Sequence, residues 1–217
     1  MVLNMNNGVF ITFEGGEGSG KSTQIQLLKD YFEKEGKSVL LTREPGGSAG
    51  AEEIRSLLLK GGTDRWDKKT EMLLFTAARR DHLIKKIFPA LSEGKIILSD
   101  RFQDSTVAYQ CFGYGYDESI FHDAKALYQF IAGDFKPNIT IVLDIDPKIG
   151  LSRSIKRQGN DEQRFENMDF SFHENIRKAF LTLAQSEPNR FIVVDANQPI
   201  QAIHEEIVSK LKEKMNA

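Results

Sequence analysis

One segment constrains the fold of this chain more than any other: residues 15–22, GGEGSGKS. The segment matches G-x-x-x-x-G-K-[ST], a glycine-rich loop that binds phosphate groups when it lies between a strand and a helix. Residues 8–14 are mostly β-branched and aromatic, which favours a buried strand. Residues 23–35 carry apolar side chains at helical spacing. A glycine-rich turn could match the motif by chance, but this context predicts a site for a nucleoside triphosphate.

The residue types in the loop explain how it would hold a triphosphate. Glycines let the backbone approach an anion, and the freed N–H groups and the helix dipole attract phosphate oxygens. Lys21 would reach the β- and γ-phosphates, and the Ser22 hydroxyl would ligate Mg²⁺. The predicted triphosphate contacts are Gly15, Gly16, Glu17, Gly18, Ser19, Gly20, Lys21, Ser22 and Thr23.

Composition excludes several other classes of protein. The 29 basic and 31 acidic residues give a net charge of -2, so we expect no nucleic acid or membrane partner. The single cysteine, Cys111, excludes an internal disulfide and suits a reducing cytoplasm. We see no signal peptide in residues 1–7 and no run of the ~18 apolar residues that a membrane span needs. Without repeats or linkers, residues 1–217 are expected to form a single domain.

Apolar segments alternate with helical ones along the whole chain. The predicted strands are residues 8–14, 37–42, 95–99, 138–145 and 191–194. The predicted helices are residues 23–35, 51–60, 70–91, 119–132, 147–157, 170–186 and 199–214. Either Asp67 or Thr70 could be the N-cap of the helix at residues 70–91. Five such strands imply a parallel sheet with helices on both faces, a three-layer α/β/α fold. Ligands bind such sheets beyond the carboxyl ends of the strands.

Charged residues follow several predicted strands at that edge. Asp100 can hold Mg²⁺ opposite Ser22, and Arg101 can clamp phosphate oxygens, although an exposed ion pair would also fit the pattern. Arg43 stands at a strand end where a second phosphate would lie, while an ordinary turn explains the following Pro45. Carboxylates and an amide also reach this edge, at Glu14, Glu44, Asp144, Asp146, Asp195 and Asn197.

Two further segments favour recognition of a ligand. Phe75 and Arg79 are four residues apart on a predicted helix, so they share a face that could stack on a base and hydrogen-bond its edge. A core phenylalanine beside a solvated arginine is the alternative. Residues 104–110 bring a hydroxyl, a phenol and an amide close behind Asp100, although alone they could simply begin an amphipathic helix.

A polar segment at residues 158–167 lies between two predicted helices, with Arg153, Lys156, Arg157 and Arg164 around it. We interpret residues 153–168 as a lid that closes over the triphosphate and brings an arginine to the transferring group. A solvated charge run is the alternative. The four histidines show no metal-ligand spacing, and no Ser/His/Asp or Cys/His arrangement is apparent.

Taken together, these segments resemble the bacterial thymidylate kinases, members of the P-loop nucleoside monophosphate kinases, over nearly the whole chain. The resemblance rests on F-E-G-x-E-G-S-G-K-S at 13–22, T-R-E-P-G-G at 42–47, E-E-I-R at 52–55, L-L-F-T-A-A-R-R at 73–80, S-D-R-F-x-D-S-x-x-A-Y-Q at 99–110 and D-A-N-Q-P at 195–199. It implies a P-loop NTPase fold and transfer of the γ-phosphoryl group of ATP to dTMP, giving dTDP and ADP with Mg²⁺, in support of dTTP synthesis. It also implies a cytoplasmic homodimer that pairs through the long helices.

The resemblance also implies roles for the acceptor site. Phe75 would stack on thymine, Arg79 would donate to its O4, and Gln110 would contact its N3 side. Tyr109 would lie against the deoxyribose where a 2′-hydroxyl would collide, and Glu14 would approach the sugar or the metal-bound water. The acceptor phosphate would be held by Arg43, Arg55 and Arg101 with Ser105 nearby, and the Glu44–Pro45 turn would border the same site.

Positions 16–19 of the loop hold no basic residue, which resembles the class that takes its catalytic arginine from the lid. Arg153, Arg157 and Arg164 are then the candidates, with Arg164 the first choice. The chain departs from many relatives at Tyr114, where an arginine is common, and at Phe102, where tyrosine or histidine is common.

Two alternatives remain open at this point. Another nucleoside monophosphate kinase would share the fold and chemistry, and only the pocket of Phe75, Arg79, Tyr109 and Gln110 separates the two. A GTP-dependent switch is the second alternative, but the chain has neither N-K-x-D nor D-x-x-G.

Overall fold

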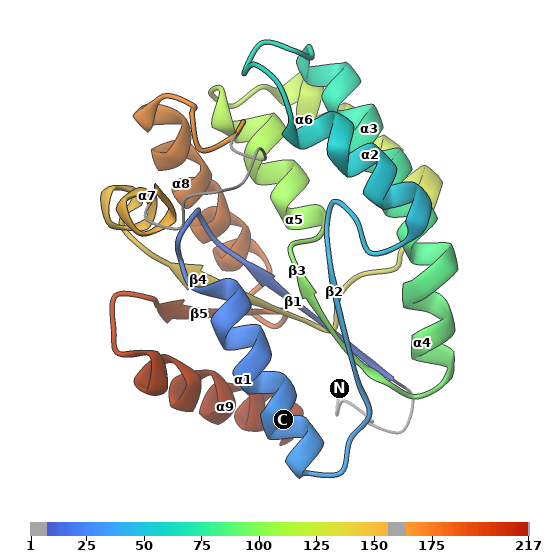
Figure 1. Cartoon of the computed structure of the whole chain (residues 1–217), viewed down its shortest axis with the longest axis vertical. Coiled ribbons are helices and arrows are strands. Elements are labelled where there is room, and N and C mark those ends of the chain that lie inside the picture. The colour runs from blue at the N-terminus through green and yellow to red at the C-terminus, as the bar shows by residue number, and fades with distance from the viewer. Residues whose placement is uncertain (1–7, 156–163, 217) are drawn as a thin grey trace.

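The computed structural model describes residues 8–155 and 164–216. Within them, five strands form one parallel sheet in the order β2-β3-β1-β4-β5 (Figure 1). The strands are β1 (Val9–Glu14), β2 (Val39–Arg43), β3 (Ile96–Asp100), β4 (Ile139–Asp144) and β5 (Phe191–Asp195). All five strands were predicted from sequence, and the parallel sheet is confirmed.

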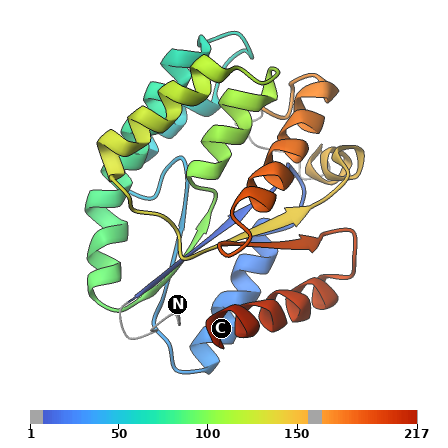
Figure 2. The same cartoon turned by 180° about the vertical axis from the view of Figure 1, so that it is seen from behind.

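Helices connect successive strands and cover both faces of the sheet (Figures 1 and 2). They are α1 (Lys21–Lys34), α2 (Ala49–Leu59), α3 (Lys68–His82), α4 (Phe88–Ser92), α5 (Gln103–Thr106), α6 (Glu118–Ala132), α7 (Pro147–Ile155), α8 (Phe170–Ser186) and α9 (Ile200–Asn216). Two π-helical segments, η2 (Leu83–Ile87) and η3 (Val107–Gly113), also occur among the described residues. No helix formed by these residues has both the length and the apolar character to span a lipid bilayer.

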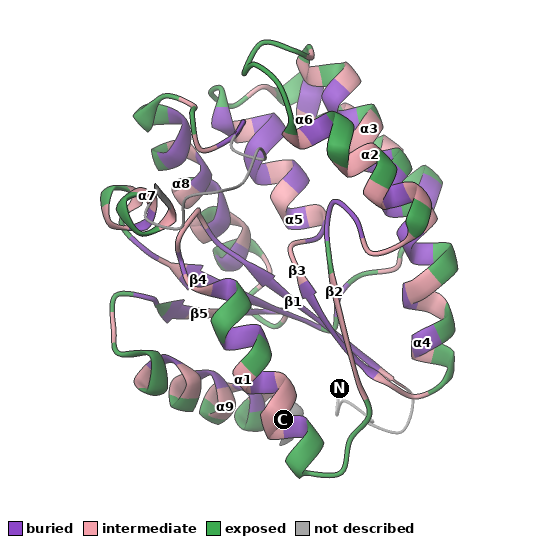
Figure 3. Cartoon of the chain, in the orientation of Figure 1, coloured by how far each residue is buried: buried purple, intermediate pink, exposed green. Residues whose placement is uncertain are grey.

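The side chains of β1 show how the three layers form. Val9, Ile11 and Phe13 point to one face, where they pack in a buried cluster with residues of α1 and α9. Phe10 points to the opposite face and packs with Leu83 of η2 and its neighbours. A strand with apolar residues on both faces must be covered on both sides, and Figure 3 shows the central strands buried between helices whose outer faces are exposed. The predicted three-layer fold is therefore confirmed.

The helix predicted over residues 70–91 differs from the observed one. It begins at Lys68 because the Asp67 side chain accepts hydrogen bonds from Lys69 N at 2.9 Å and Thr70 N at 3.1 Å, which confirms Asp67 as the N-cap. It then widens into η2 just ahead of Pro89, which lies in the first turn of α4. Proline clashes with the preceding turn of a regular α-helix, so the wider turn accommodates it.

Residues 103–113 form α5 and η3, a helical stretch that the predicted element order did not include. Its β-branched and aromatic residues have modest helix propensity. Burial decides the outcome: Ala108 and Tyr109 pack in one cluster with Ile176 and Phe180 of α8. The prediction that residues 1–217 form a single domain, with a lid at about residues 153–168, stays a prediction.

Strand register places the polar strand ends side by side. Arg43 of β2 and Phe13 of β1 both pair with Asp100 of β3, and Asp144 of β4 pairs with Asp195 of β5. The carboxyl ends of the strands therefore meet at one edge, as predicted, and the glycine-rich loop begins there.

Candidate active site

The glycine-rich loop joins β1 to α1 at the carboxyl edge of the sheet. Gly18 has a φ of +66°, and a Cβ added there would lie 1.9 Å from the Gly150 carbonyl oxygen of α7. Gly20 precedes α1 with a φ of 90°, a left-handed conformation that suits glycine. Glycine at position 18 allows the close approach to α7, and glycine at position 20 allows the left-handed turn into α1. The amino end of a helix attracts anions, so this turn suits a phosphate-binding loop.

Lys21 begins α1 and points back into the loop. Its ammonium donates to Gly15 O at 3.1 Å, Gly16 O at 3.0 Å and Ser19 Oγ at 3.4 Å. Burial and the nearby Arg101 guanidinium lower the pKa of Lys21. The loop therefore positions a buried cation before any phosphate enters.

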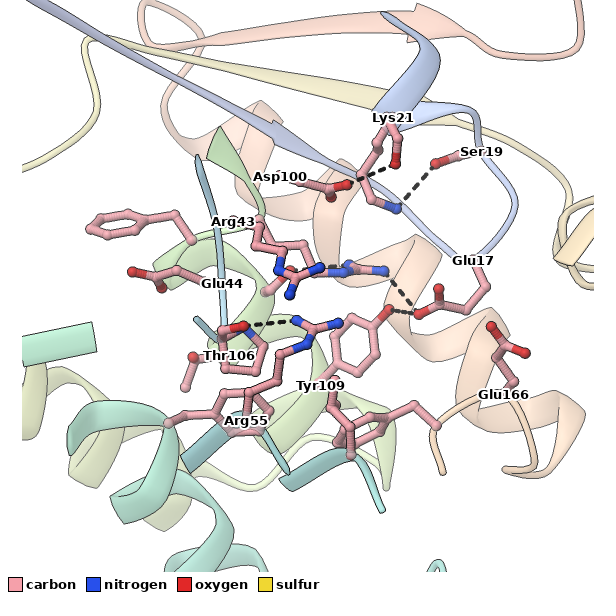
Figure 4. Close-up of a pocket in the computed structure, with 18 of the residues that line it drawn as sticks. Glu17, Ser19, Lys21, Arg43, Glu44, Arg55, Asp100, Thr106, Tyr109 and Glu166 are labelled. Carbon is pink, nitrogen blue, oxygen red and sulfur yellow. Dashed lines mark hydrogen bonds and ion pairs between the residues drawn. The ribbon is translucent and has the colours of Figure 1, made fainter. Parts of the chain in front are cut away.

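Asp100 lies near this cation (Figure 4). The Ser22 hydroxyl donates to Asp100 Oδ2 at 3.1 Å. A hydroxyl and a carboxylate are hard oxygen ligands of the kind that Mg²⁺ binds, usually together with phosphate oxygens and water. Among the described residues, no three His, Cys, Asp or Glu side chains gather as a metal site. The pair fits a metal that a bound nucleotide helps to hold.

Arg101 links the loop to the helical stretch behind it. Its backbone φ is 71°, an uncommon value for a residue with a side chain. Its Nη1 donates to Gly15 O and Ser105 Oγ, both at 3.1 Å, and its Nη2 donates to Glu17 Oε1 at 2.8 Å. The guanidinium carbon lies 5.0 Å from the centre of the Tyr109 ring. The unusual backbone turn thus directs a fixed cation toward the loop.

Glu17, the one acidic residue in the loop, is surrounded by donors. The Tyr109 phenol donates to its Oε1 at 2.7 Å, and Arg101 donates to the same oxygen. Burial alone would raise the pKa of Glu17, but the charges of Arg101 and Lys21 and the Tyr109 hydrogen bond lower it to about 2. Glu17 is therefore an ionised carboxylate between the loop and Tyr109 (Figure 4).

A cavity of about 400 Å³ opens from the loop toward α2 and α3. Most of the predicted site residues line it: Glu17, Gly18, Ser19, Gly20, Lys21, Ser22, Arg43, Glu44, Pro45, Arg55, Phe75, Arg79, Asp100, Arg101, Ser105, Tyr109 and Gln110. Their individual roles stay predictions. One cavity nevertheless joins the phosphate loop to the residues predicted to recognise an acceptor.

Arg79 is buried at this cavity, with 2% of its surface exposed, so the solvated alternative is wrong. Its Nε donates to Glu44 Oε2 at 2.7 Å, its Nη1 to Gln103 Oε1 at 2.6 Å and its Nη2 to Thr106 Oγ1 at 2.9 Å. His82 Nδ1 lies 2.9 Å from the other Glu44 oxygen. These contacts hold the guanidinium in one place, while further N–H groups remain available to a ligand.

Arg43 and Arg55 lie across the cavity from the loop (Figure 4). Arg43 is exposed and its Nη2 donates to Glu52 Oε2 at 3.0 Å. Arg55 donates from Nη1 to the Pro45 carbonyl at 2.7 Å. Arg43 is the last residue of β2, and Arg55 belongs to α2, the helix that follows. A phosphate bound there would face the loop from the other side.

Glu14 does not line the cavity but supports it from behind. The side chain is fully buried, and it accepts hydrogen bonds from Phe102 N at 2.8 Å and from Ser105 Oγ at 2.5 Å. Burial, reinforced by the nearby charge of Asp104, raises the pKa of Glu14 to about 8. These contacts favour a role in holding residues 101–105, not the predicted approach to a sugar or metal-bound water.

Two of the predicted lid arginines, Arg153 and Arg164, are described in this structure, and neither lines the cavity. Arg164 has four acceptors elsewhere: the carbonyls of Leu58, Gly62 and Thr63, and the buried carboxylate of Glu71. Reaching a transferring phosphoryl group would require Arg164 to leave all four, so these contacts do not support our first choice. Arg153 donates to Ala196 O at 3.2 Å. Arg157 lies outside the described residues.

Six cavity residues had no predicted site role: Leu59, Phe102, Thr106, Ser154, Phe165 and Glu166. Two of them close the cavity from the lid side, where Ser154 Oγ donates to Glu166 Oε1 at 2.7 Å. Phe165 was detectable in principle, because it is the only aromatic residue in the polar segment 158–167. No sequence pattern marks Thr106 as a cavity residue, because its role depends on a hydrogen bond from Arg79, 27 positions away in the chain.

Comparison with known proteins gives a consistent result. The family model described as thymidylate kinase matches residues 13–207. A thymidylate kinase of Magnetococcus marinus is 50% identical over 196 residues, which cover 90% of this chain and 91% of the relative. One from Bacillus anthracis is 41% identical over 210 residues, covering 96% and 99%.

A solved structure supports the same relationship. The crystal structure of thymidylate kinase from Ehrlichia chaffeensis superposes with a TM-score of 0.76 at 35% sequence identity. The match covers 94% of this chain and 99% of that chain, so nearly all of the fold described above is shared.

Proposed function

This chain belongs to the thymidylate kinase family and is a nucleoside monophosphate kinase, and we propose that it transfers the γ-phosphoryl group of ATP to dTMP, giving dTDP and ADP. The observation that carries this proposal is the shared cavity. Lys21 of the phosphate loop and Phe75, Arg79 and Gln110 of the predicted base site line the same space. A donor triphosphate and an acceptor nucleotide can therefore meet in it.

The chemistry of the acceptor explains the residues present. A phosphate monoester has its second pKa near ~6, so the attacking oxygen is already ionised at neutral pH and needs no general base. The site must instead hold two anions in line and neutralise the charge that develops between them. Lys21 and Arg101 provide fixed cations on the loop side, and Arg43 and Arg55 provide them on the acceptor side.

The cofactor proposal follows from the oxygen ligands. Ser22 and Asp100 would hold Mg²⁺, which when bound would neutralise charge on the β- and γ-phosphate oxygens. The Asp100 carboxylate lies at the end of β3, paired in register with Phe13 before the loop, so the sheet positions it. Removing divalent metal with EDTA should abolish ADP formation, and adding MgCl₂ should restore it. Full activity in EDTA would contradict the magnesium proposal.

A coupled assay of ADP release tests the reaction itself. We expect dTMP to be phosphorylated faster than dUMP, dCMP, dGMP and AMP at equal concentrations, with ATP and MgCl₂ present. A clearly faster acceptor among the other four would favour another nucleoside monophosphate kinase. Equal affinity for GTP and ATP without phosphorylation of any acceptor would favour the switch alternative.

We also propose that the protein is a homodimer and acts in the cytoplasm. Exposed apolar side chains on neighbouring helices support the dimer, namely Leu57 of α2, Leu73 of α3 and Ile84 of η2. Sedimentation equilibrium at micromolar concentration should give twice the chain mass, and a monomer there would contradict this. The buried free thiol of Cys111 fits a reducing compartment, and cell fractionation would test the location.

A further inference from the structure

The carboxamide of Gln110 has one paired end and one unpaired end. Gln110 belongs to η3, is 1% exposed and lines the cavity. Its Nε2 donates to Glu71 Oε1 at 2.7 Å. Its Oε1 is buried and has no hydrogen-bond partner within the described part of the chain. Buried polar atoms are almost always paired in folded proteins, so an unpaired oxygen beside a ligand cavity points to a partner on the ligand.

The contacts of Glu71 determine which end of the amide is which. Glu71 is 1% exposed, and its other oxygen accepts from the Arg164 guanidinium. An arginine stays protonated in proteins, and a carboxylate paired with it is ionised and can only accept hydrogen bonds. The group of Gln110 that faces Glu71 must therefore be the NH₂ group. The Gln110 carbonyl oxygen, Oε1, therefore lies at the other end of the amide. If the amide were flipped, Gln110 Oε1 would face Glu71 Oε1, and two hydrogen-bond acceptors would repel each other.

Arg164 is in turn fixed by the backbone. It donates to the carbonyl oxygens of Leu58, Gly62 and Thr63, at the end of α2 and in the turn that follows. A chain of buried contacts thus runs from that turn through Arg164 and Glu71 to Gln110 at the cavity. An ion pair that served stability alone would need only Arg164 and Glu71. Here Glu71 also accepts a hydrogen bond from Gln110, and this bond prevents the Gln110 amide from rotating.

We infer that Glu71 is a positioning residue that sets the base specificity of the acceptor site by presenting the Gln110 oxygen as a hydrogen-bond acceptor. The ligand group that satisfies this oxygen is a ring N–H, as in the imide of thymine or uracil. Cytosine has an unprotonated ring nitrogen at that position, so two acceptors would face each other. This inference rests on the proposed function, because it assumes that a nucleoside monophosphate base enters the cavity near Gln110.

The test compares dUMP with dCMP, two acceptors that both lack the thymine methyl group and differ at the base edge. We expect the wild-type protein to show a higher kcat/KM for dUMP. In Glu71→Gln the new amide can both donate and accept, so Gln110 is no longer held in one orientation. The ratio of kcat/KM for dUMP to that for dCMP should then fall about ten- to hundredfold, the usual consequence of one mismatched buried polar contact. An unchanged ratio, with dTMP still phosphorylated, would overturn the inference and leave the proposed function intact.

A matched control separates this effect from a general loss of charge. Glu118→Gln makes the same chemical change at an exposed site on α6. Its ratio of kcat/KM for dUMP to kcat/KM for dCMP should equal the wild-type ratio. A structural role for Glu71 predicts that rates with both acceptors fall by the same factor, which would also overturn the inference.

Glu71→Gln removes the charged partner of a buried arginine, so it could fail to fold. A circular dichroism melt would detect this. In that case the wild-type protein itself gives the test, through binding of dTMP and of N3-methyl-dTMP measured by calorimetry. Loss of the ring N–H should weaken binding by about a hundredfold or more. Equal affinity for the two ligands would overturn the inference, whereas a wild-type protein that phosphorylates no pyrimidine nucleotide would refute the proposed function.

Discussion

The Tyr109 phenol oxygen lies 2.7 Å from Glu17 Oε1 and donates a hydrogen bond to it. Tyr109 belongs to the π-helical segment η3, and Glu17 belongs to the phosphate loop, so the contact ties the acceptor side of the cavity to the donor side. Arg101 completes the arrangement, because it donates to the same Glu17 oxygen and stacks over the Tyr109 ring. A change in any one of these three side chains should therefore affect the other two.

Tyr109→Phe keeps the ring under Arg101 but removes the hydroxyl that donates to Glu17. Glu17 then depends on Arg101 alone at that oxygen, and Arg101 is drawn more strongly toward it and away from a substrate phosphate. We expect KM for dTMP to rise several-fold, and the free energy of unfolding to fall by about 1 kcal/mol for the lost hydrogen bond. Steady-state kinetics and urea denaturation measure the two effects. Wild-type values in both would show that the contact is not used.

Lys21→Ala should abolish turnover. The ammonium lies within the loop that we propose holds the triphosphate. Removing a cation that contacts a moving phosphoryl group costs about 10³-fold or more in rate. Lys37→Ala, an exposed position before β2, should leave kcat unchanged and serves as the control. ADP release at saturating ATP and dTMP provides the measurement. A Lys21→Ala protein with more than a tenth of the wild-type kcat would contradict the role assigned to the loop.

Arg79→Ala should raise KM for dTMP and reduce discrimination among bases, because Arg79 is the predicted donor to the base edge. The structure adds a second effect. Glu44 would lose its buried guanidinium partner and keep only His82 at its other oxygen, so unfolding should become easier by about 3 kcal/mol.

Arg79→Lys separates the two effects of this change. It keeps the positive charge near Glu44 but lacks the planar fork that reaches Gln103 and Thr106 as well. The free energy of unfolding of Arg79→Lys should lie between those of the wild type and Arg79→Ala. Its KM for dTMP should be raised above the wild-type value, as in Arg79→Ala. Unchanged KM and base preference in both variants would refute a role of Arg79 in base recognition.

The layered fold could be predicted because its signals are local. The loop motif, the apolar runs of the strands and the Asp67 cap are each readable within a few residues. The helical stretch 103–113 was considered only as a helix that residues 104–110 could begin, because residues such as Val107 and Tyr109 favour strands. Burial makes the stretch helical: Tyr109 packs with residues of α8, and Val107 packs with residues of α3 and α6. Propensity is a weak signal when tertiary packing opposes it.

Site prediction reached a similar limit. Asp100 and Arg101 could be placed at the carboxyl edge of the sheet, because the end of a strand in a parallel sheet has a known position. Their roles stay predictions. The partner of Arg164 was not found, because Glu71 is 93 positions away and lies on a helix face that reads as ordinary surface. An arginine in a polar segment has the same local pattern whether it serves a phosphate or a buried carboxylate. Its contacts decide between the two, and these depend on the whole fold.

The pH dependence of stability provides a prediction with opposite signs at Glu14 and Glu17. Burial raises the pKa of Glu14 from 4.5 to about 8, so between these values the folded state keeps a proton that the unfolded state has released. The stabilisation from this proton is complete below about pH 4.5 and disappears as the pH rises toward 8. The pKa of Glu17 is instead lowered to about 2, so its stabilisation is present above about pH 4.5 and is lost as the pH falls toward 2.

Glu14→Gln places a neutral side chain of the same size at that position and removes its titration. Urea denaturation of this variant and of the wild type at pH 5 and pH 8 measures the difference. Relative to Glu14→Gln, the wild type should lose stability between these values, by up to roughly 1.4 kcal/mol per pH unit in the range where only the folded state holds the proton. Glu17→Gln should instead follow the wild-type pH dependence from 5 to 8, because Glu17 is ionised in both states there. If Glu14→Gln and the wild type respond to pH identically, the Glu14 carboxyl does not titrate in this range, and its burial does not raise its pKa as the structure indicates.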